Sequence, residues 1–135
     1  MVMHELVFAD SEVAAVGARG DGLCLRFSAA HVRRLAHPAG AGGDEGYVPA
    51  LELHFDRARW EDDGGLLAAC IGPLAQVQWR EEETGPRRSL PLPYASAGAV
   101  EAHFEFRNGE RLAVRAASAH VEAPDGLRFL ESLAC

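Results

Sequence analysis

A glutamate and a histidine at alternate positions occur together twice in the sequence, and this pattern is the one best suited to chemistry. Residues 52–55 read Glu-Leu-His-Phe, and residues 101–104 read Glu-Ala-His-Phe. In an extended strand alternate side chains share a face, so each glutamate projects with its histidine while the apolar residues take the opposite face. Imidazoles and carboxylates are ligands for zinc and iron. If the two strands were neighbours, they could therefore form a metal site.

A solvated sheet surface is the alternative interpretation of the same residues. Glutamate and histidine are common on exposed sheet faces, and a hairpin register derived below gives Glu101 and the nearby Glu105 arginine partners, which lessens their need of a cation. We therefore expect all four motif residues to lie on the surface without a bound ion: Glu52, His54, Glu101 and His103. The sequence accordingly predicts no metal ligand, no cofactor-binding residue and no catalytic residue.

Other patterns associated with catalysis or ligand binding are missing or incomplete. The serines lie outside any Gly-x-Ser-x-Gly motif, and the chain has no lysine that could form a Schiff base. The glycine-rich residues 38–46 lack the lysine of a phosphate-binding loop, so we predict a flexible surface loop there. The acidic residues 61–65 lack the ligand spacing of a calcium loop, and we interpret them as a solvated turn.

Composition indicates a small acidic domain. The 135 residues suit a single domain spanning 1–135, and 13 basic against 20 acidic residues give a net charge of −7. That balance disfavours nucleic acid and an anionic membrane surface as partners. All basic residues are arginine, and this bias, together with abundant alanine and glycine, is typical of a GC-rich bacterial genome.

The cysteines and the apolar segments bear on the compartment. Cys24, Cys70 and Cys135 are odd in number and widely spaced, so we predict no intramolecular disulfide. The first residues lack the pattern of a signal peptide, and the longest nearly apolar run, residues 66–75, is too short to cross a bilayer. These features predict a cytoplasmic protein.

Turn residues recur at intervals of roughly eight to fifteen residues, with alternating apolar and polar residues between them, which is typical of short strands. Residues 29–36 and 127–133 fit either a helix or a strand. The predicted fold is all-β, an antiparallel β-sandwich or partly closed β-barrel of about eight to ten strands, with 127–133 as a candidate short C-terminal helix. The predicted strands are 4–9, 12–18, 22–28, 47–56, 66–71, 74–82, 88–92, 98–107 and 110–117.

Hairpin registers follow from the requirement that apolar residues share one face. A two-residue Asn-Gly turn at 108–109 would mix apolar and charged side chains on both faces. A three-residue loop at 107–109, with Gly109 in the left-handed conformation, instead pairs Phe104 with Leu112 and Ala102 with Val114 on the apolar face. On the polar face it brings opposite charges together: Glu101 with Arg115, and Glu105 with Arg111.

Two further hairpins follow from the same requirement. One has a four-residue loop at 83–86, with Trp79 opposite Leu90, Val77 opposite Leu92, Glu81 opposite Arg88 and Glu82 opposite Arg87. Because prolines 91 and 93 cannot donate ladder hydrogen bonds, the strand at 88–92 is predicted at a sheet edge. The other hairpin has a loop at 19–22, with Val16 opposite Leu25 and Ala14 opposite Phe27.

Two classes of function stay open at this point. The favoured class is a non-enzymatic binding or interaction domain, because no catalytic constellation emerges, and the acidic balance would suit a basic protein partner. The alternative is a small β-barrel that binds a ligand or a metal near His54 and His103 and could be an enzyme. A barrel interior filled by side chains would favour the first class, and an enclosed pocket would favour the second.

Overall fold

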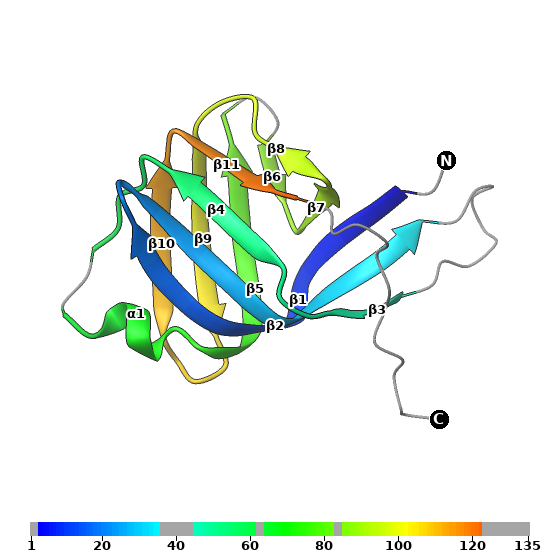
Figure 1. Cartoon of the computed structure of the whole chain (residues 1–135), viewed down its shortest axis with the longest axis horizontal. Coiled ribbons are helices and arrows are strands. Elements are labelled where there is room, and N and C mark those ends of the chain that lie inside the picture. Colours follow the sequence, from blue (N-terminus) through cyan, green and yellow to red (C-terminus); the bar gives the residue numbers. More distant parts are fainter. Residues whose placement is uncertain (1–2, 36–44, 62–63, 83–84, 123–135) are drawn as a thin grey trace.

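The computed structural model describes residues 3–35, 45–61, 64–82 and 85–122, and these form eleven antiparallel strands and one helix of four residues. Two long strands, β1 (Met3–Arg19) and β2 (Gly22–Leu35), form a hairpin that runs across the whole molecule (Figure 1). The remaining elements are β3 (Glu45–Val48), β4 (Glu52–Asp56), α1 (Leu66–Ala69), β5 (Gly72–Glu81), β6 (Gly85–Arg87), β7 (Ser89–Leu92), β8 (Tyr94–Ala95), β9 (Val100–Phe106), β10 (Arg111–Ala116) and β11 (Ser118–Val121).

The strands follow the order β10-β9-β5-β1-β2-β4-β11-β8, with β3 beside β2, β6 beside β5 and β7 beside β1. The β2-β4-β11 side and the β5-β9-β10 side form two layers that cross each other in Figure 1. Strand β1 joins the layers through a short contact in which Glu12 and Val13 pair with Pro73 and Gly72. The sheet is not closed, and the predicted all-β class, an antiparallel β-sandwich or partly closed β-barrel, is confirmed.

Aromatic side chains fill the space between the layers. The Trp79 ring stacks on Phe8 at 5.7 Å between centroids and lies 5.6 Å from Phe55. Phe104 meets both phenylalanines edge to face, at 6.1 and 6.2 Å. All four side chains are fully or almost fully buried. The space between the layers is thus occupied by side chains.

The long β1–β2 hairpin bends at a bulge near Ser11. The register shifts between Val7 and Glu12, and Asp10 in this segment has a φ of 67°. The buried Ser11 hydroxyl donates to the Val7 carbonyl at 2.7 Å and accepts from the His31 amide at 2.8 Å. These bonds satisfy backbone groups that the interrupted ladder would leave unpaired.

One of the three predicted hairpins has the expected core register throughout, and a second has it in part. In the β9–β10 hairpin Phe104 pairs with Leu112, Ala102 with Val114, Glu105 with Arg111 and Glu101 with Arg115, and Gly109 has a φ of 95°. In the β1–β2 hairpin Val16 pairs with Leu25, but the turn is tighter than predicted because residues 19 and 22 themselves pair. The bulge also places Val13, not Ala14, opposite Phe27.

The predicted pairing of Trp79 with Leu90 is wrong. Trp79 pairs with Arg87 in the short β6, whereas β7 pairs with β1, where Leu6 lies opposite Leu90. Both leucines are fully buried, and burying them is worth more than the few tenths of a kcal/mol offered by exposed charge pairs. Among the described strands β7 pairs with β1 alone, which agrees with the predicted edge position.

Other segments also differ from expectation. Residues 66–69, predicted as part of a strand, form α1, because leucine and alanine are strong helix formers and a glycine pair precedes them. The ambiguous residues 29–35 belong to β2. Within the glycine-rich segment, Glu45 and Gly46 belong to β3, and the rest of the predicted loop lies outside the described residues. The candidate helix at 127–133 also lies outside them.

Candidate binding groove at the β10 edge

The outer face of the β5-β9-β10 layer carries polar side chains in rows across the strands. His103 on β9 lies between Gln78 on β5 and Ala113 on β10. The neighbouring rows are Gln76 with Glu105 and Arg111, and Arg80 with Glu101 and Arg115. The alternation that buries Phe104 and Leu112 thus places the polar residues on the opposite face.

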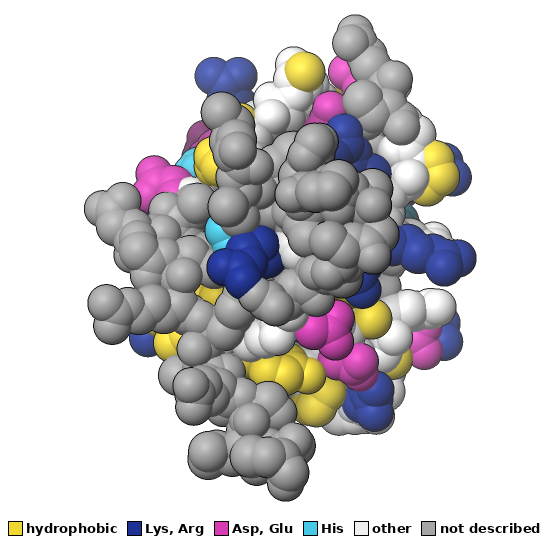
Figure 2. Space-filling model, turned by 90° about the vertical axis from the view of Figure 1, so that its right-hand side faces the viewer, with side chains coloured by type: hydrophobic (Ala, Val, Ile, Leu, Met, Phe, Trp, Pro, Cys, Tyr) yellow, Lys and Arg dark blue, Asp and Glu magenta, His cyan; other side chains and the backbone are white. Residues whose placement is uncertain are grey.

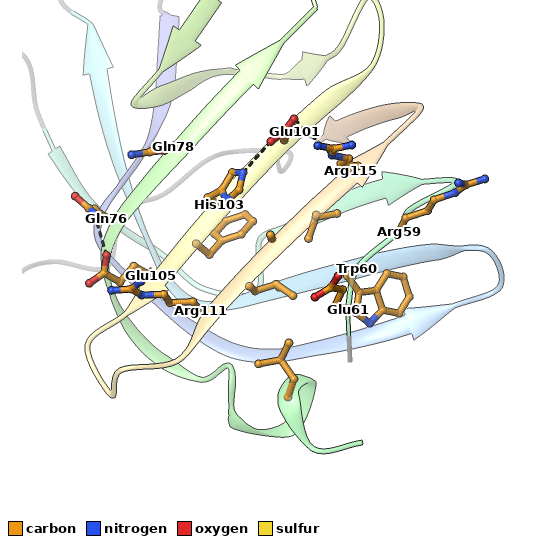
Figure 3. Close-up of a pocket in the computed structure, with 15 residues that line it drawn as sticks. Arg59, Trp60, Glu61, Gln76, Gln78, Glu101, His103, Glu105, Arg111 and Arg115 are labelled. Atoms are coloured by element: carbon orange, nitrogen blue, oxygen red, sulfur yellow. Dashed lines mark hydrogen bonds and ion pairs between the residues drawn. The ribbon is translucent and has the colours of Figure 1, made fainter. Parts of the chain in front are cut away.

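A groove of about 920 Å³ runs over this face and across the edge of β10 (Figure 3). Beyond that edge it is bounded by Arg59, Trp60 and Glu61, which follow β4, and by Leu66 of α1. The groove therefore joins a charged sheet face to an aromatic side chain, with one strand edge between them.

The main chain of β10 is paired along only part of its outer edge. The amide and carbonyl of Arg115 bond to the carbonyl and amide of Arg59 at 2.9 and 2.7 Å, and the Ala117 amide donates to the Asp56 carbonyl at 3.0 Å. Backbone groups of alternate residues point to the same side of a strand, so those of Ala113 and Arg111 point to this edge as well. No described residue bonds to them there, and they are open within the groove.

The charges of the groove are only partly paired. His103 Nε2 lies 2.9 Å from Glu101 Oε1, and Arg115 Nε lies 3.6 Å from Glu101 Oε2. The hydrogen bond from His103, followed by the charge of Arg115, lowers the pKa of the Glu101 carboxyl. By contrast, Arg59 and Arg111 have no carboxylate within 4.0 Å among the described residues. Two cations of the groove are therefore available to a ligand.

The two Glu-x-His motifs are not brought together. Glu52 and His54 lie on β4, which pairs with β2 and β11, whereas Glu101 and His103 lie on β9, which pairs with β5 and β10. Each histidine nevertheless lies beside its own glutamate, with 3.6 Å between His54 Nε2 and Glu52 Oε1. The predicted burial of the intervening apolar side chains is confirmed: Leu53, Phe55, Ala102 and Phe104.

Strand pairing gives His54 neighbours that the sequence did not single out. Cys24 on β2 lies directly opposite His54, and His120 on β11 lies opposite its other side. The Cys24 thiol donates to Glu52 Oε2 at 3.7 Å; burial, and next the charge of Glu52, raises the pKa of this thiol. Alternation shows that Cys24 and His54 each lie opposite the apolar face of their own strand, but the Cys24–His54 pair follows only from the observed β2–β4 register.

A third polar cluster lies inside the fold. The Tyr94 hydroxyl donates to the buried Glu81 carboxylate and accepts from Trp79 Nε1 at 3.3 Å. Burial, followed by the Glu81 carboxylate, raises the pKa of Tyr94 to about 12. The Arg87 guanidinium lies over the tyrosine ring, 5.8 Å from its centroid. The Glu81 and Tyr94 residues of this cluster are buried.

The rest of the described surface has little apolar character. Ile71 is the one large apolar side chain exposed among the described residues. On the face seen in Figure 2, arginine and acidic side chains are interspersed and not segregated. None of the described helices is long and apolar enough to cross a membrane. Comparison with protein-family models, with curated proteins and with solved structures found no match to this chain.

Proposed function

We propose that this protein is a non-enzymatic binding domain that takes up an extended segment of a protein partner along the open edge of β10. The observation that carries the proposal is the pair of open main-chain positions, Arg111 and Ala113, inside the groove. An exposed strand edge binds an extended peptide through main-chain hydrogen bonds, and the flanking side chains select its sequence. The filled interior supports an outer-surface function over an enclosed ligand site.

Local charge favours an acidic residue in the bound segment. Arg59 and Arg111, which have no carboxylate within 4.0 Å among the described residues, lie on the two sides of the open edge, and Trp60 offers an aromatic surface beside them. The groove as a whole has three arginines and three glutamates, so the chain's net charge of −7 is not concentrated there. For this groove an acidic segment is a better match than the basic partner that the net charge suggested. We place the domain in the cytoplasm, a proposal supported by the free thiols of Cys24 and Cys70.

Selection from a displayed library of random linear peptides tests this proposal, with Ala113→Pro as the decisive variant. Proline at 113 removes the amide that points to the open edge and obstructs strand addition, but it leaves the ladder with β9 intact. The matched control is Ala113→Val, which keeps the amide and suits a strand.

Peptides selected on the parent protein should bind Ala113→Val with similar affinity. They should bind Ala113→Pro at least about tenfold more weakly, the equivalent of roughly one to two lost main-chain hydrogen bonds. The selected peptides should be enriched in aspartate and glutamate. The Arg111→Glu substitution should lower the affinity of the protein for them. Equal affinity for the proline variant, verified as folded by thermal unfolding, would overturn strand addition, as would failure to select any peptide.

A further inference from the structure

Three strands of the other layer place a thiol and two imidazoles in one row on their outer face. Cys24 of β2 pairs with His54 of β4, and His54 pairs with His120 of β11. Glu52 lies two residues before His54 and shares its face. The adjacent inward positions, Leu53 and Phe55, are buried, so the row is backed by the core.

The potential ligand atoms are close together. The Cys24 sulfur, one Glu52 carboxylate oxygen and one His54 nitrogen all lie within 4.8 Å of one another. Cys24 is nearly buried, and the side chains of His54 and Glu52 are 26% and 39% exposed. The cluster therefore has two features of a metal site, convergent ligands and partial shielding from water.

His120 holds the His54 ring in position from the other side. The two imidazoles stack with their centroids 4.9 Å apart and their planes at 14°. His120 Nδ1 in turn lies 3.4 Å from Asp56 Oδ2. Stacked against this ring, His54 directs Nε2 towards Glu52. Such supporting contacts orient the ligands of metal sites.

We propose that Cys24, Glu52 and His54 bind a zinc-class divalent transition metal ion, with the fourth position open to water. Sulfur at about 2.3 Å and nitrogen or oxygen at about 2.0–2.2 Å from zinc bring tetrahedral ligand atoms to roughly 3.3–3.7 Å of one another. The separations of 3.7 Å between Cys24 Sγ and Glu52 Oε2 and of 3.6 Å between His54 Nε2 and Glu52 Oε1 lie within this range. On binding, the thiol proton passes to solvent, and the sulfur coordinates as thiolate. A thiolate ligand disfavours magnesium and calcium. For Glu52 and His54 this proposal replaces the expectation of an ion-free surface.

The chain contains its own matched control for this site. Glu101 and His103 repeat the Glu-x-His motif on β9, with 2.9 Å between the imidazole and the carboxylate. The cross-strand neighbours of His103 are Gln78 and Ala113, which offer no thiol and no imidazole. If a Glu-x-His pair alone sufficed to bind metal, both motifs would bind, so the cysteine neighbour is the feature that distinguishes them.

The test is titration of the purified 135-residue chain with Co²⁺, followed by displacement with Zn²⁺, in a background in which Cys135 is replaced by serine. The parent should bind one equivalent of cobalt with a thiolate-to-cobalt charge-transfer band, and zinc should abolish that band. Cys24→Ser should lose the band. His54→Ala and Glu52→Gln should weaken binding at least about tenfold, and His103→Ala should leave it unchanged.

Three results would overturn the proposal: no stoichiometric binding by the parent, a charge-transfer band that survives Cys24→Ser, or equal losses in His54→Ala and His103→Ala. Thermal unfolding without metal establishes that each variant is folded. If Cys24→Ser does not fold, Glu52→Gln decides, because its carboxylate is partly exposed and its loss leaves the core intact. The groove at β10 lies in the other layer, so failure of metal binding leaves the peptide proposal unaffected.

Discussion

Replacing Tyr94 with phenylalanine removes one hydroxyl from the interior and leaves the aromatic packing in place. The ring packs edge to face against Trp79 at 5.8 Å, and a phenylalanine ring can make the same contact. What is lost is the hydrogen bond to the Glu81 carboxylate and the acceptor for the Trp79 indole N–H. The substitution therefore isolates the energetic role of this buried hydrogen-bond chain.

The expected destabilisation follows from the groups left behind. An unsatisfied buried polar group costs about 1–3 kcal/mol, and more when it is charged. Two groups lose a partner here, and the Glu81 residue is only 6% exposed. Allowing for partial relief by repacking or entry of water, we expect Tyr94→Phe to lower the free energy of unfolding by about 2–4 kcal/mol.

Urea unfolding followed by circular dichroism measures this change, and Tyr47→Phe is the matched control. Tyr47 is the chain's other tyrosine; its ring packs on His31, and its hydroxyl makes no hydrogen bond to the described residues. Tyr47→Phe should stay within about 0.5 kcal/mol of the parent. Equal small effects of the two substitutions would refute the view that the buried chain contributes to stability.

The same pair of proteins has a predictable dependence on pH. The folded state raises the pKa of Tyr94 from 10.0 to about 12. A raised pKa means that this stabilisation is fully present below pH 10.0 and is lost as the pH rises towards 12. The difference in stability between the parent and Tyr94→Phe should therefore shrink across that interval. A difference in stability that grows over this pH interval would contradict the expected direction.

Three further predictions concern local features. Gly109 has a φ of 95°, so Gly109→Val should lower the free energy of unfolding measured in urea by about 1 kcal/mol or more. The control is Gly17→Ala, at a position with open space around it, which should lower the free energy of unfolding by less than about 0.5 kcal/mol. Thiol titration of freshly prepared, denatured, non-reduced protein should find three free thiols, and finding one would show a disulfide. The side chain of His103 is 52% exposed, so His103→Ala should change the free energy of unfolding by less than about 0.5 kcal/mol. A larger loss would contradict a surface role.

Local pairings were predictable because a turn and an apolar pattern together admit few registers. The Phe104–Leu112 and Val16–Leu25 pairs follow from one loop each. The position of β7 was not predictable in this way, since Leu90 has the same alternation whether it faces Trp79 or Leu6. Packing of the whole core decides which of two apolar strands β7 joins. The sequence of a single hairpin does not determine this packing.

The candidate sites show the same division between local and distant information. The polar outer faces of β4 and β9 follow from the alternation of side chains. The cross-strand neighbours of these polar residues, however, lie on strands that are distant in the sequence. Cys24 and His120 reach His54 only through the β2-β4-β11 order. The open edge of β10 likewise depends on Arg59, which bonds to Arg115, whereas no described residue bonds to the outward main-chain groups of Ala113. Sequence patterns identify which side of a strand is polar, and the order of the strands determines which residues lie beside these polar residues.

Amide hydrogen exchange at Ala113, with and without a selected peptide, tests strand addition to β10 most directly. In the free protein the Ala113 amide points to the open edge and should exchange quickly, while the Leu112 and Val114 amides bond to β9 and should exchange slowly. Saturating peptide should slow exchange at Ala113 to the level of its neighbours. Binding that leaves the Ala113 amide in fast exchange would contradict the proposed function.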